Sequence, residues 1–473
     1  MILGGLANKI VRKFLIFNGR MRILFGYVSI ICSIISMIAI GYTISPFQYE
    51  TSIFFLSEFS PFSVGAYLVI SIGIILAEFV TIKETDICSE KSFNAFISLL
   101  LIQAGSFFIV SAVSWLLVFL GYILLFASFN FYIRIMYTQN EDNNQNFISP
   151  YFIMNALSIV ILFVSIICYN ITENSYHIHN MLGIQKIWEF LCLSFILFFL
   201  YIQLGCPPFH LRIFSHSDQK KNSSSQLLIV VQRGISIVFL IKILSIFRYS
   251  DYSKVLQWIF VISGIIFTFW GILASMTEEK LQKLVNYVSL SHIGFIFLLI
   301  SFLFSFNIDQ EIVVNIYQGL CYLSLAYILF YSFTLAVTSI ISKGYDTFEL
   351  NDLRGLGRRT YLLPFLMLLA FILLFAFPIA IGFQTNLFNY SLMPSSLYFI
   401  MVLFDLQIVL SFVYLARILK ILYFERRVPT IRYSTVEPSI YMALLFSLFL
   451  VIVFLIFSTR IFDLCTFMTE TFS

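Results

Sequence analysis

Leu362-Leu-Pro-Phe-Leu-Met-Leu-Leu-Ala-Phe-Ile-Leu-Leu-Phe-Ala-Phe-Pro-Ile-Ala-Ile-Gly-Phe383 is the stretch of the sequence that decides the fold, because it contains no charged residue. The apolar core of a bilayer is about 30 Å thick, which a helix of about 20 apolar residues spans. Backbone groups in that core must bond internally, so such a run must be helical. The stretch therefore predicts a membrane-spanning helix, and Pro378 inside it predicts a local break.

Similar apolar runs fill the rest of the chain and are separated by short polar loops. Hydrophobic residues make up 60% of the 473 residues and charged residues only 11%, against about 25% charged in soluble proteins. We therefore predict an all-α polytopic membrane protein of about 13 transmembrane helices. The predicted spans are 23–44, 63–82, 94–113, 115–137, 150–172, 186–206, 227–247, 256–276, 285–306, 313–343, 361–383, 397–424 and 437–462.

Composition also excludes several kinds of function. The net charge of +4 is small and dispersed, so no nucleic-acid partner is expected. The seven cysteines are scattered, whereas iron–sulfur and zinc sites require clustered ligands, so no metal or cofactor is expected in this chain. The 56 Phe and 26 Tyr against 20 Gly are typical of an AT-rich organellar genome.

Ionisable side chains inside the predicted spans are few, and such groups usually line a functional path. Glu189 lies one turn from a helix start, which is equally compatible with an interfacial position. Asp405 lies about two turns inside its span, which favours a buried polar role. The full set of candidates is Glu78, Glu189, Arg233, Lys242, His292 and Asp405.

Three separated groups of motifs are more specific than the charges. The first is Leu204-Gly-Cys-Pro-Pro-Phe-His210 followed by Val231-Gln-Arg233 and Lys242. The second is Lys280-Leu-Gln-Lys283-Leu-Val-Asn-Tyr287-Val-Ser-Leu-Ser-His292-Ile-Gly-Phe295. The third combines Asp352-Leu-Arg-Gly-Leu, Phe377-Pro378-Ile-Ala-Ile-Gly382-Phe383 and Tyr414-Leu-Ala-Arg417-Ile-Leu-Lys420-Ile-Leu-Tyr-Phe424-Glu425.

In order and spacing, from about Phe96 to Glu425, these motifs resemble the antiporter-like membrane subunits of respiratory complex I. The terminal Tyr414 to Glu425 segment is typical of the chain 2 branch of NADH:ubiquinone oxidoreductase. The resemblance implies two inverted five-helix repeats, each with one broken helix. It implies an N-terminal arm with peripheral helices over 1–93, repeats over 94–248 and 249–424, and a C-terminal helix over 425–473. The breaks are expected near Ser223–Arg233 and at Pro378.

The resemblance also implies a function. The chain would be a core membrane-arm subunit of a proton-translocating NADH:ubiquinone reductase in the mitochondrial inner membrane, without a catalytic site of its own. FMN, iron–sulfur clusters and ubiquinone would be bound elsewhere in the complex. Its partners would be the other membrane-arm subunits, lipids such as cardiolipin and, in some membranes, a respiratory supercomplex.

The family carries a central row of ionisable groups for proton transfer, and this sequence departs from it. The expected glutamate falls on Ile123, and the expected lysines fall on Gln203, Arg233 and Asn386. Ile, Gln and Asn cannot titrate and Arg stays charged, so we expect the path to be interrupted and the chain to scaffold the arm if its own path is degenerate. His292 is the best titratable candidate, although it could equally bond a facing helix.

Two lysines and two competing functions complete the expectations. Lys242 could substitute for Arg233, and Lys283 could reach inwards from a helix start. One alternative function is a free-standing cation/proton antiporter of the related multi-subunit type, which would need the charge row intact. The other is a membrane-embedded acyl- or glycosyltransferase, which would rest on His210, His216 and Asp218.

Overall fold

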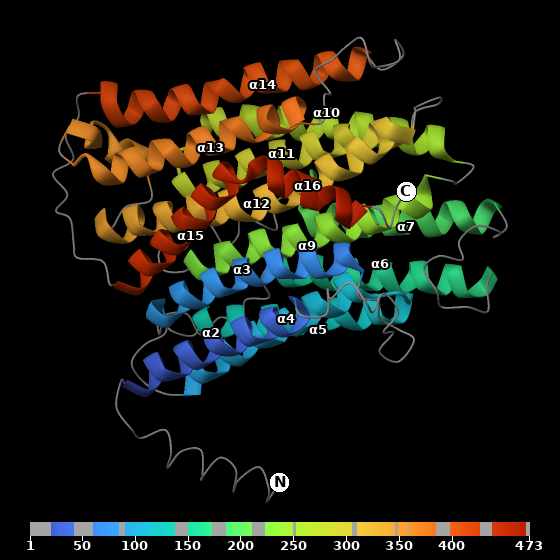
Figure 1. Cartoon of the computed structure of the whole chain (residues 1–473), viewed down its shortest axis with the longest axis horizontal. Coiled ribbons are helices and arrows are strands. Elements are labelled where there is room, and N and C mark those ends of the chain that lie inside the picture. The colour runs from blue at the N-terminus through green and yellow to red at the C-terminus, as the bar shows by residue number, and fades with distance from the viewer. Residues whose placement is uncertain are drawn as a thin grey trace, which may run out of the picture.

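A computed structural model of the chain describes a bundle of long helices whose axes lie nearly parallel (Figure 1). The described residues are 20–41, 60–84, 90–137, 150–172, 186–210, 223–248, 252–304, 310–345, 349–358, 360–384, 398–425 and 438–469. The α-helices are α2 (Arg20–Gly41), α3 (Pro61–Glu84), α4 (Glu90–Ser111), α5 (Trp115–Tyr137), α6 (Pro150–Thr172), α7 (Lys186–Leu204), α9 (Ser223–Phe247), α10 (Ser253–Thr277), α11 (Leu281–Leu303), α12 (Gln310–Tyr345), α13 (Leu362–Gln384), α14 (Tyr398–Leu419), α15 (Pro438–Ile456) and α16 (Ser458–Thr469).

Each predicted span corresponds to one of these helices, so the all-α membrane fold is confirmed. The α5 and α6 bounds coincide with the predicted 115–137 and 150–172. In the described residues ten helices are long and apolar enough to cross a membrane, or eleven if the bent pair α15 and α16 is one span. Two further apolar helices, Phe25–Ile40 and Phe190–Leu204, are shorter. The predicted count of 13 is therefore not confirmed.

Helices α9, α11 and α12 form the core of the bundle. In each of these three helices 94% of the most apolar stretch is buried inside the bundle, against 39% of the corresponding stretch of α6. α9 packs against α3, α7 and α12, and so joins α2–α7 on one side of the bundle to α10–α14 on the other (Figure 1). A helix that is apolar all round belongs inside such a bundle.

Glycines allow α10 and α11 to pack with their backbones in contact. A Cβ at Gly271 would lie 2.6 Å from the backbone nitrogen of Ser291, and one at Gly294 would lie 2.6 Å from the backbone nitrogen of Thr268. Lipid is as apolar as a side chain, so close backbone packing is a main source of helix association in membranes. The glycine that follows His292 in the second motif thus sets the position of α11.

The helix breaks differ from those predicted. α9 is continuous over Ser223–Phe247, so the break predicted near Ser223–Arg233 is wrong. The first half is instead interrupted where α7 ends at Leu204, because Gly205 adopts a φ of 68° that favours glycine. α13 passes through Pro378 and ends at Gln384, so its described residues do not open at this proline. Pro378 removes one backbone hydrogen bond. The neighbouring turns keep theirs, because unpaired backbone groups are strongly unfavourable in lipid.

The C-terminal segment contains two helices rather than the single predicted helix. α15 and α16 meet at an angle of 75°. α16 turns back onto the bundle and packs against α12 and α3 (Figure 1). This position buries Cys465 and Met468, whereas Arg460 and Asp463 remain exposed.

Candidate functional site

Polar side chains cross the buried interior of the bundle from α6 to α14. We call this set the polar belt, and each member is at most 6% exposed. Its members lie on α6, α7, α9, α11, α12 and α14. They are Tyr151, Asn155, Ser158, Gln203, Gln232, Arg233, Ser289, His292, Tyr331 and Gln407.

Neutral groups make up the part of the polar belt between α6 and α9. Tyr151 Oη donates to Gln232 Oε1. Gln232 Nε2 donates to Gln203 Oε1 at 2.7 Å, and Gln203 Nε2 donates to Ser158 Oγ at 2.8 Å. Ser158 Oγ completes the chain by donating to the backbone oxygen of Asn155 at 2.7 Å. Gln203, Gln232 and Ser158 satisfy one another here, whereas Asn155 Nδ2 has no partner among the described residues. A hydrogen-bonded network therefore accommodates the predicted loss of a titratable group at Gln203.

Arg233 is the charged member of the polar belt. It lies on α9, is 2% exposed and donates through Nη1 to Ser289 Oγ on α11. Its Nε has no hydrogen-bond partner, and no carboxylate among the described residues forms an ion pair with it. A guanidinium does not deprotonate in proteins. Arg233 therefore places a fixed positive charge at the centre of the bundle.

His292 lies one turn after Ser289 on α11 and is fully buried. Its Nδ1 is 2.7 Å from Tyr331 Oη on α12, and its ring stacks on Phe377 of α13 with centroids 4.6 Å apart. Its Nε2 has no partner among the described residues. From the sequence, His292 could either transfer protons or bond to a facing helix. The structure contains the bond to α12, and Nε2 makes no hydrogen bond in the described residues.

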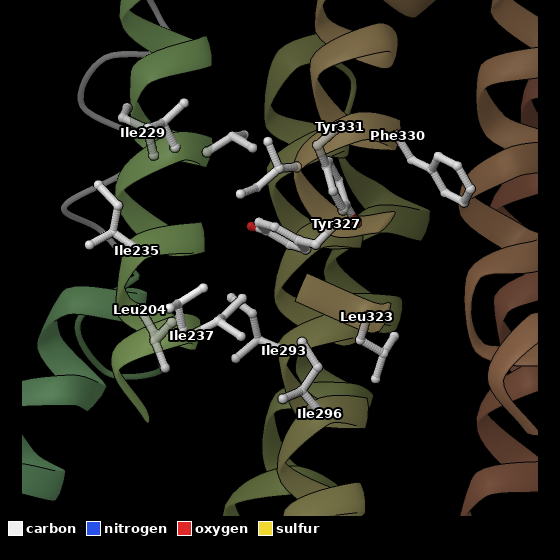
Figure 2. Close-up of a cluster of buried hydrophobic side chains, with 14 of the residues drawn as sticks. Leu204, Ile229, Ile235, Ile237, Ile293, Ile296, Leu323, Tyr327, Phe330 and Tyr331 are labelled. Carbon is white, nitrogen blue, oxygen red and sulfur yellow. The ribbon is translucent and has the colours of Figure 1, made fainter. Parts of the chain in front are cut away.

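Apolar side chains surround the polar belt and separate its members from water. Figure 2 shows Ile229, Ile235 and Ile237 of α9 opposite Ile293 and Ile296 of α11. The hydroxyl of Tyr327 on α12 points from this cluster toward α9, and it makes no hydrogen bond in the described structure. Such surroundings strengthen each hydrogen bond and make each unpaired polar group unfavourable.

Lys242 has a partner that the sequence does not reveal. Its Nζ donates to the backbone oxygens of Val110 at 2.9 Å and Ala112 at 2.5 Å. These carbonyls lie at the C-terminal end of α4, where helix carbonyls lack intrahelical partners and attract cations. In this structure Lys242 joins α9 to the junction of α4 and α5, away from Arg233 and His292.

The remaining candidates are not brought into the polar belt. Ile123 is 37% exposed on the outer face of α5, so a path through this position is not supported. Asp405 on α14 and Lys283 on α11 are half-buried and are not members of the belt. Glu189 lies on α7, but its side chain is outside the described part of the chain, as is Asn386.

Sequence reasoning missed the uncharged members of the polar belt. The available signal was a carboxamide inside an apolar run, as at Asn155, Gln232 and Gln407. Gln407 Nε2 donates to the backbone oxygen of Ser291 at 3.0 Å, which ties α14 to the turn that carries His292. Among the described residues no three His, Cys, Asp or Glu side chains are placed to hold a metal ion. His210 packs edge-on against Trp270, and His216 and Asp218 are outside the described residues.

The second and third motif groups also meet at one end of the bundle. Leu350 N donates to the backbone oxygen of Glu279 at 2.8 Å, and Gly355 N donates to that of Ile421 at 2.9 Å. Arg354 Nε lies 2.8 Å from Glu425 Oε2. Much of the motif pattern therefore fixes loops against helix ends.

Comparison with known proteins agrees with this arrangement. The family model described as NADH:quinone oxidoreductase/Mrp antiporter, TM, matches residues 112–411. NADH-quinone oxidoreductase subunit N of Francisella tularensis subsp. holarctica is 24% identical over 383 residues, covering 77% of this chain and 76% of that protein. NADH-ubiquinone oxidoreductase chain 2 of Marchantia polymorpha is 22% identical over 395 residues, covering 80% and 77%.

The fold is found in solved structures as well. A chain of respiratory complex I from Thermus thermophilus with bound Aureothin superposes with a TM-score of 0.69 and 15% identity, over 95% of both chains. The family model covers well over half of the present chain. The chain belongs to the family of NADH:quinone oxidoreductase and Mrp antiporter transmembrane subunits.

Proposed function

We propose that the chain is a core membrane-arm subunit of a proton-translocating NADH:quinone oxidoreductase, respiratory complex I. The observation that carries the proposal is the family match over residues 112–411, which contains every member of the polar belt. Relatives named subunit N and chain 2 each cover more than three quarters of this chain. Electron transfer through FMN, iron–sulfur clusters and ubiquinone is assigned to other subunits.

Within this function we propose that the α6–α9 part of the polar belt scaffolds rather than relays protons. The Tyr151–Gln232–Gln203–Ser158 chain contains no group that changes charge near neutral pH. Arg233 keeps its charge whatever its neighbours do. Proton movement within the belt is then limited to the His292–Tyr331 pair.

The alternative is an autonomous cation/proton antiporter, since the family includes Mrp antiporters. An exchanger working alone must carry titratable groups across the whole bundle. The neutral amides at Gln203 and Gln232 disfavour this function. We therefore place the chain in a complex in which other subunits provide proton paths.

The proposed location is the mitochondrial inner membrane, which the composition bias and a relative from Marchantia polymorpha support. The proposed partners are the other membrane-arm subunits, with lipids such as cardiolipin at the lipid-facing surface and a supercomplex where one forms. Large apolar side chains such as Trp258, Ile262 and Leu273 are exposed on α10 of the isolated chain. A surface of this kind requires lipid or another subunit.

Native electrophoresis after mild detergent extraction tests the proposal. A subunit of complex I must migrate with a large assembly that oxidises NADH and reduces quinone. A free antiporter would migrate without that activity, and this result would overturn the proposal. Depletion of the chain provides the second measurement, because it should abolish the assembled complex without changing the abundance of other respiratory enzymes.

A further inference from the structure

A buried carboxyl group lies outside the polar belt and outside the residues that the family model matches. Glu78 is in the C-terminal third of α3 and is fully buried. Its Oε1 accepts a hydrogen bond of 3.0 Å from Ser33 Oγ on α2. Its Oε2 has no partner among the described residues.

No described cation neutralises this carboxyl. Helix α9 packs against α3 and carries Lys242, but this lysine bonds to the backbone oxygens of Val110 and Ala112. Arg460 and Asp463 of α16 are exposed. Residues 25–40 of α2, 92–111 of α4 and 440–456 of α15, whose side chains the structure describes, contain no charged residue. Residues 312–345 of α12 contain one, Lys343, two residues before the end of that helix, and Arg233 on α9 bonds to Ser289. A buried carboxylate without a cation is strongly unfavourable, so the group must bind a proton or another cation.

Polar side chains connect Glu78 with the N-terminal half of α3. Gln103 Nε2 of α4 donates to Ser36 Oγ at 2.9 Å, and Ser36 Oγ donates to the backbone oxygen of Ser33 at 2.8 Å. Ser36 Oγ also lies 3.2 Å from Tyr67 Oη. We call Tyr67, Ser36, Gln103, Ser33 and Glu78 the polar seam. From Tyr67 to Glu78 it covers eleven residue-to-residue steps of α3, which is about 16 Å of helix.

A second line of hydroxyls begins one turn beyond Glu78. Thr81 Oγ1 lies 2.8 Å from Tyr132 Oη of α5, and Tyr132 Oη donates to Ser224 Oγ of α9 at 2.6 Å. From Tyr67 to Thr81 the polar groups cover about 21 Å along α3 at 1.5 Å per residue. Glu78 lies between the two lines and is the one carboxyl in either of them.

We propose that Glu78 is a proton-binding site of this chain, separate from the polar belt, whose carboxyl binds a proton and releases it. Ser33 Oγ donates to the carboxyl, whereas Ser36 Oγ donates to the backbone oxygen of Ser33, which accepts but carries no proton. The polar seam therefore holds Ser33 against Glu78 and is not a continuous line of hydroxyls. A carboxyl in apolar surroundings can hold a proton. The proposal does not depend on the assembly in which the chain works.

Labelling with N,N′-dicyclohexylcarbodiimide tests this in native membranes. The apolar reagent adds to a protonated carboxyl and not to an ionised one, and mass spectrometry of the digested chain locates the adduct. We expect an adduct on Glu78 at neutral pH that decreases at alkaline pH. Glu425 is the matched control, because its carboxylate is paired with Arg354 and should remain unmodified. Absence of an adduct on Glu78 at every pH would overturn the proposal.

Na⁺ distinguishes a proton from a metal ion at the same carboxyl. Labelling that Na⁺ suppresses at constant pH would assign the site to Na⁺ and contradict the proposal, whereas labelling that is insensitive to Na⁺ supports it. Infrared difference spectra give an independent readout. The band of a protonated carboxyl should be present in wild-type membranes and absent from membranes with Glu78→Gln. If Glu78→Gln does not accumulate, Ser33→Ala still tests the site, because it removes the hydrogen bond to Oε1 and keeps the carboxyl. Labelling of Glu78 should then persist to a more alkaline pH than in the wild type, and loss of labelling would contradict the proposal.

Discussion

Gln232 Nε2 donates a hydrogen bond of 2.7 Å to Gln203 Oε1, and this bond joins α9 to α7 inside the bundle. Each carboxamide has a further partner, Tyr151 for Gln232 and Ser158 for Gln203. From the resemblance to the family, a lysine is expected at the position of Gln203. In this chain a neutral network occupies the same space. Four predictions follow for the polar belt and for Lys242, which lies apart from it on α9.

Gln203→Leu should lower the stability of the assembled protein by about 1–3 kcal/mol, because it leaves buried polar groups of Gln232 and Ser158 unsatisfied. The midpoint of thermal unfolding of the purified complex measures this. Ile123→Leu on the outer face of α5 is the control and should leave the midpoint unchanged. Equal midpoints for wild type and Gln203→Leu would contradict the network.

Removing the charge of Arg233 should be tolerated better than removing its acceptor. Arg233→Met eliminates a buried cation that has no carboxylate partner among the described residues, so stability should be equal or higher. Ser289→Ala keeps that cation and removes its hydrogen-bond acceptor, which should lower stability by about 1–3 kcal/mol. Thermal unfolding of the two variants side by side gives the answer. The opposite order of stability would show that Arg233 has a partner that these contacts do not include.

His292 and Tyr331 should be energetically coupled. His292→Phe preserves an aromatic ring against Phe377 but leaves the Tyr331 hydroxyl without its partner. Tyr331→Phe removes the same bond from the other side. In a double-mutant cycle the two losses should be less than additive by about 1 kcal/mol. Strict additivity would mean that the 2.7 Å contact contributes nothing to stability.

Lys242 should behave as a structural cation. Lys242→Met should destabilise the protein by about 1.5–3 kcal/mol, because hydrogen bonds from a charged donor to two carbonyl groups are lost. Lys242→Arg should retain part of this stability. The number of protons translocated per NADH in reconstituted complex should be unchanged in both variants. If a fully assembled Lys242→Arg complex translocated fewer protons per NADH, Lys242 would belong to the proton path.

The helices could be predicted closely because one physical requirement determines them. The predicted 115–137 and 150–172 coincide with α5 and α6. A backbone leaving the aqueous interface must bond to itself, so the ends of an apolar run are also the ends of a helix. The position of the helix break in the first half of the chain was harder to predict from the sequence. It depends on the conformation of Gly205 before Pro207, and no hydrophobic pattern reports a backbone angle.

The candidate site was predictable only in part. His292 was singled out correctly as a buried titratable group, but its partners Tyr331 and Phe377 lie 39 and 85 residues further along the chain. Lys242 and Arg233 are both cations on α9, yet one bonds to the end of α4 and the other to Ser289 of α11. Their spacing along the helix does not reveal which neighbouring helix each will meet.

By itself the sequence determined that this chain is a bundle of membrane helices and which family it belongs to, and it predicted that family charges are replaced at Gln203 and Asn386. Only the tertiary structure decided that Ile123 faces outwards, that Gln203 bonds to Gln232 and that Glu78 is enclosed with Ser33. The physical reason is that helices apolar on every side have no amphipathic pattern to show which face is buried. Their rotation is set by close packing and by the few polar groups that must find partners.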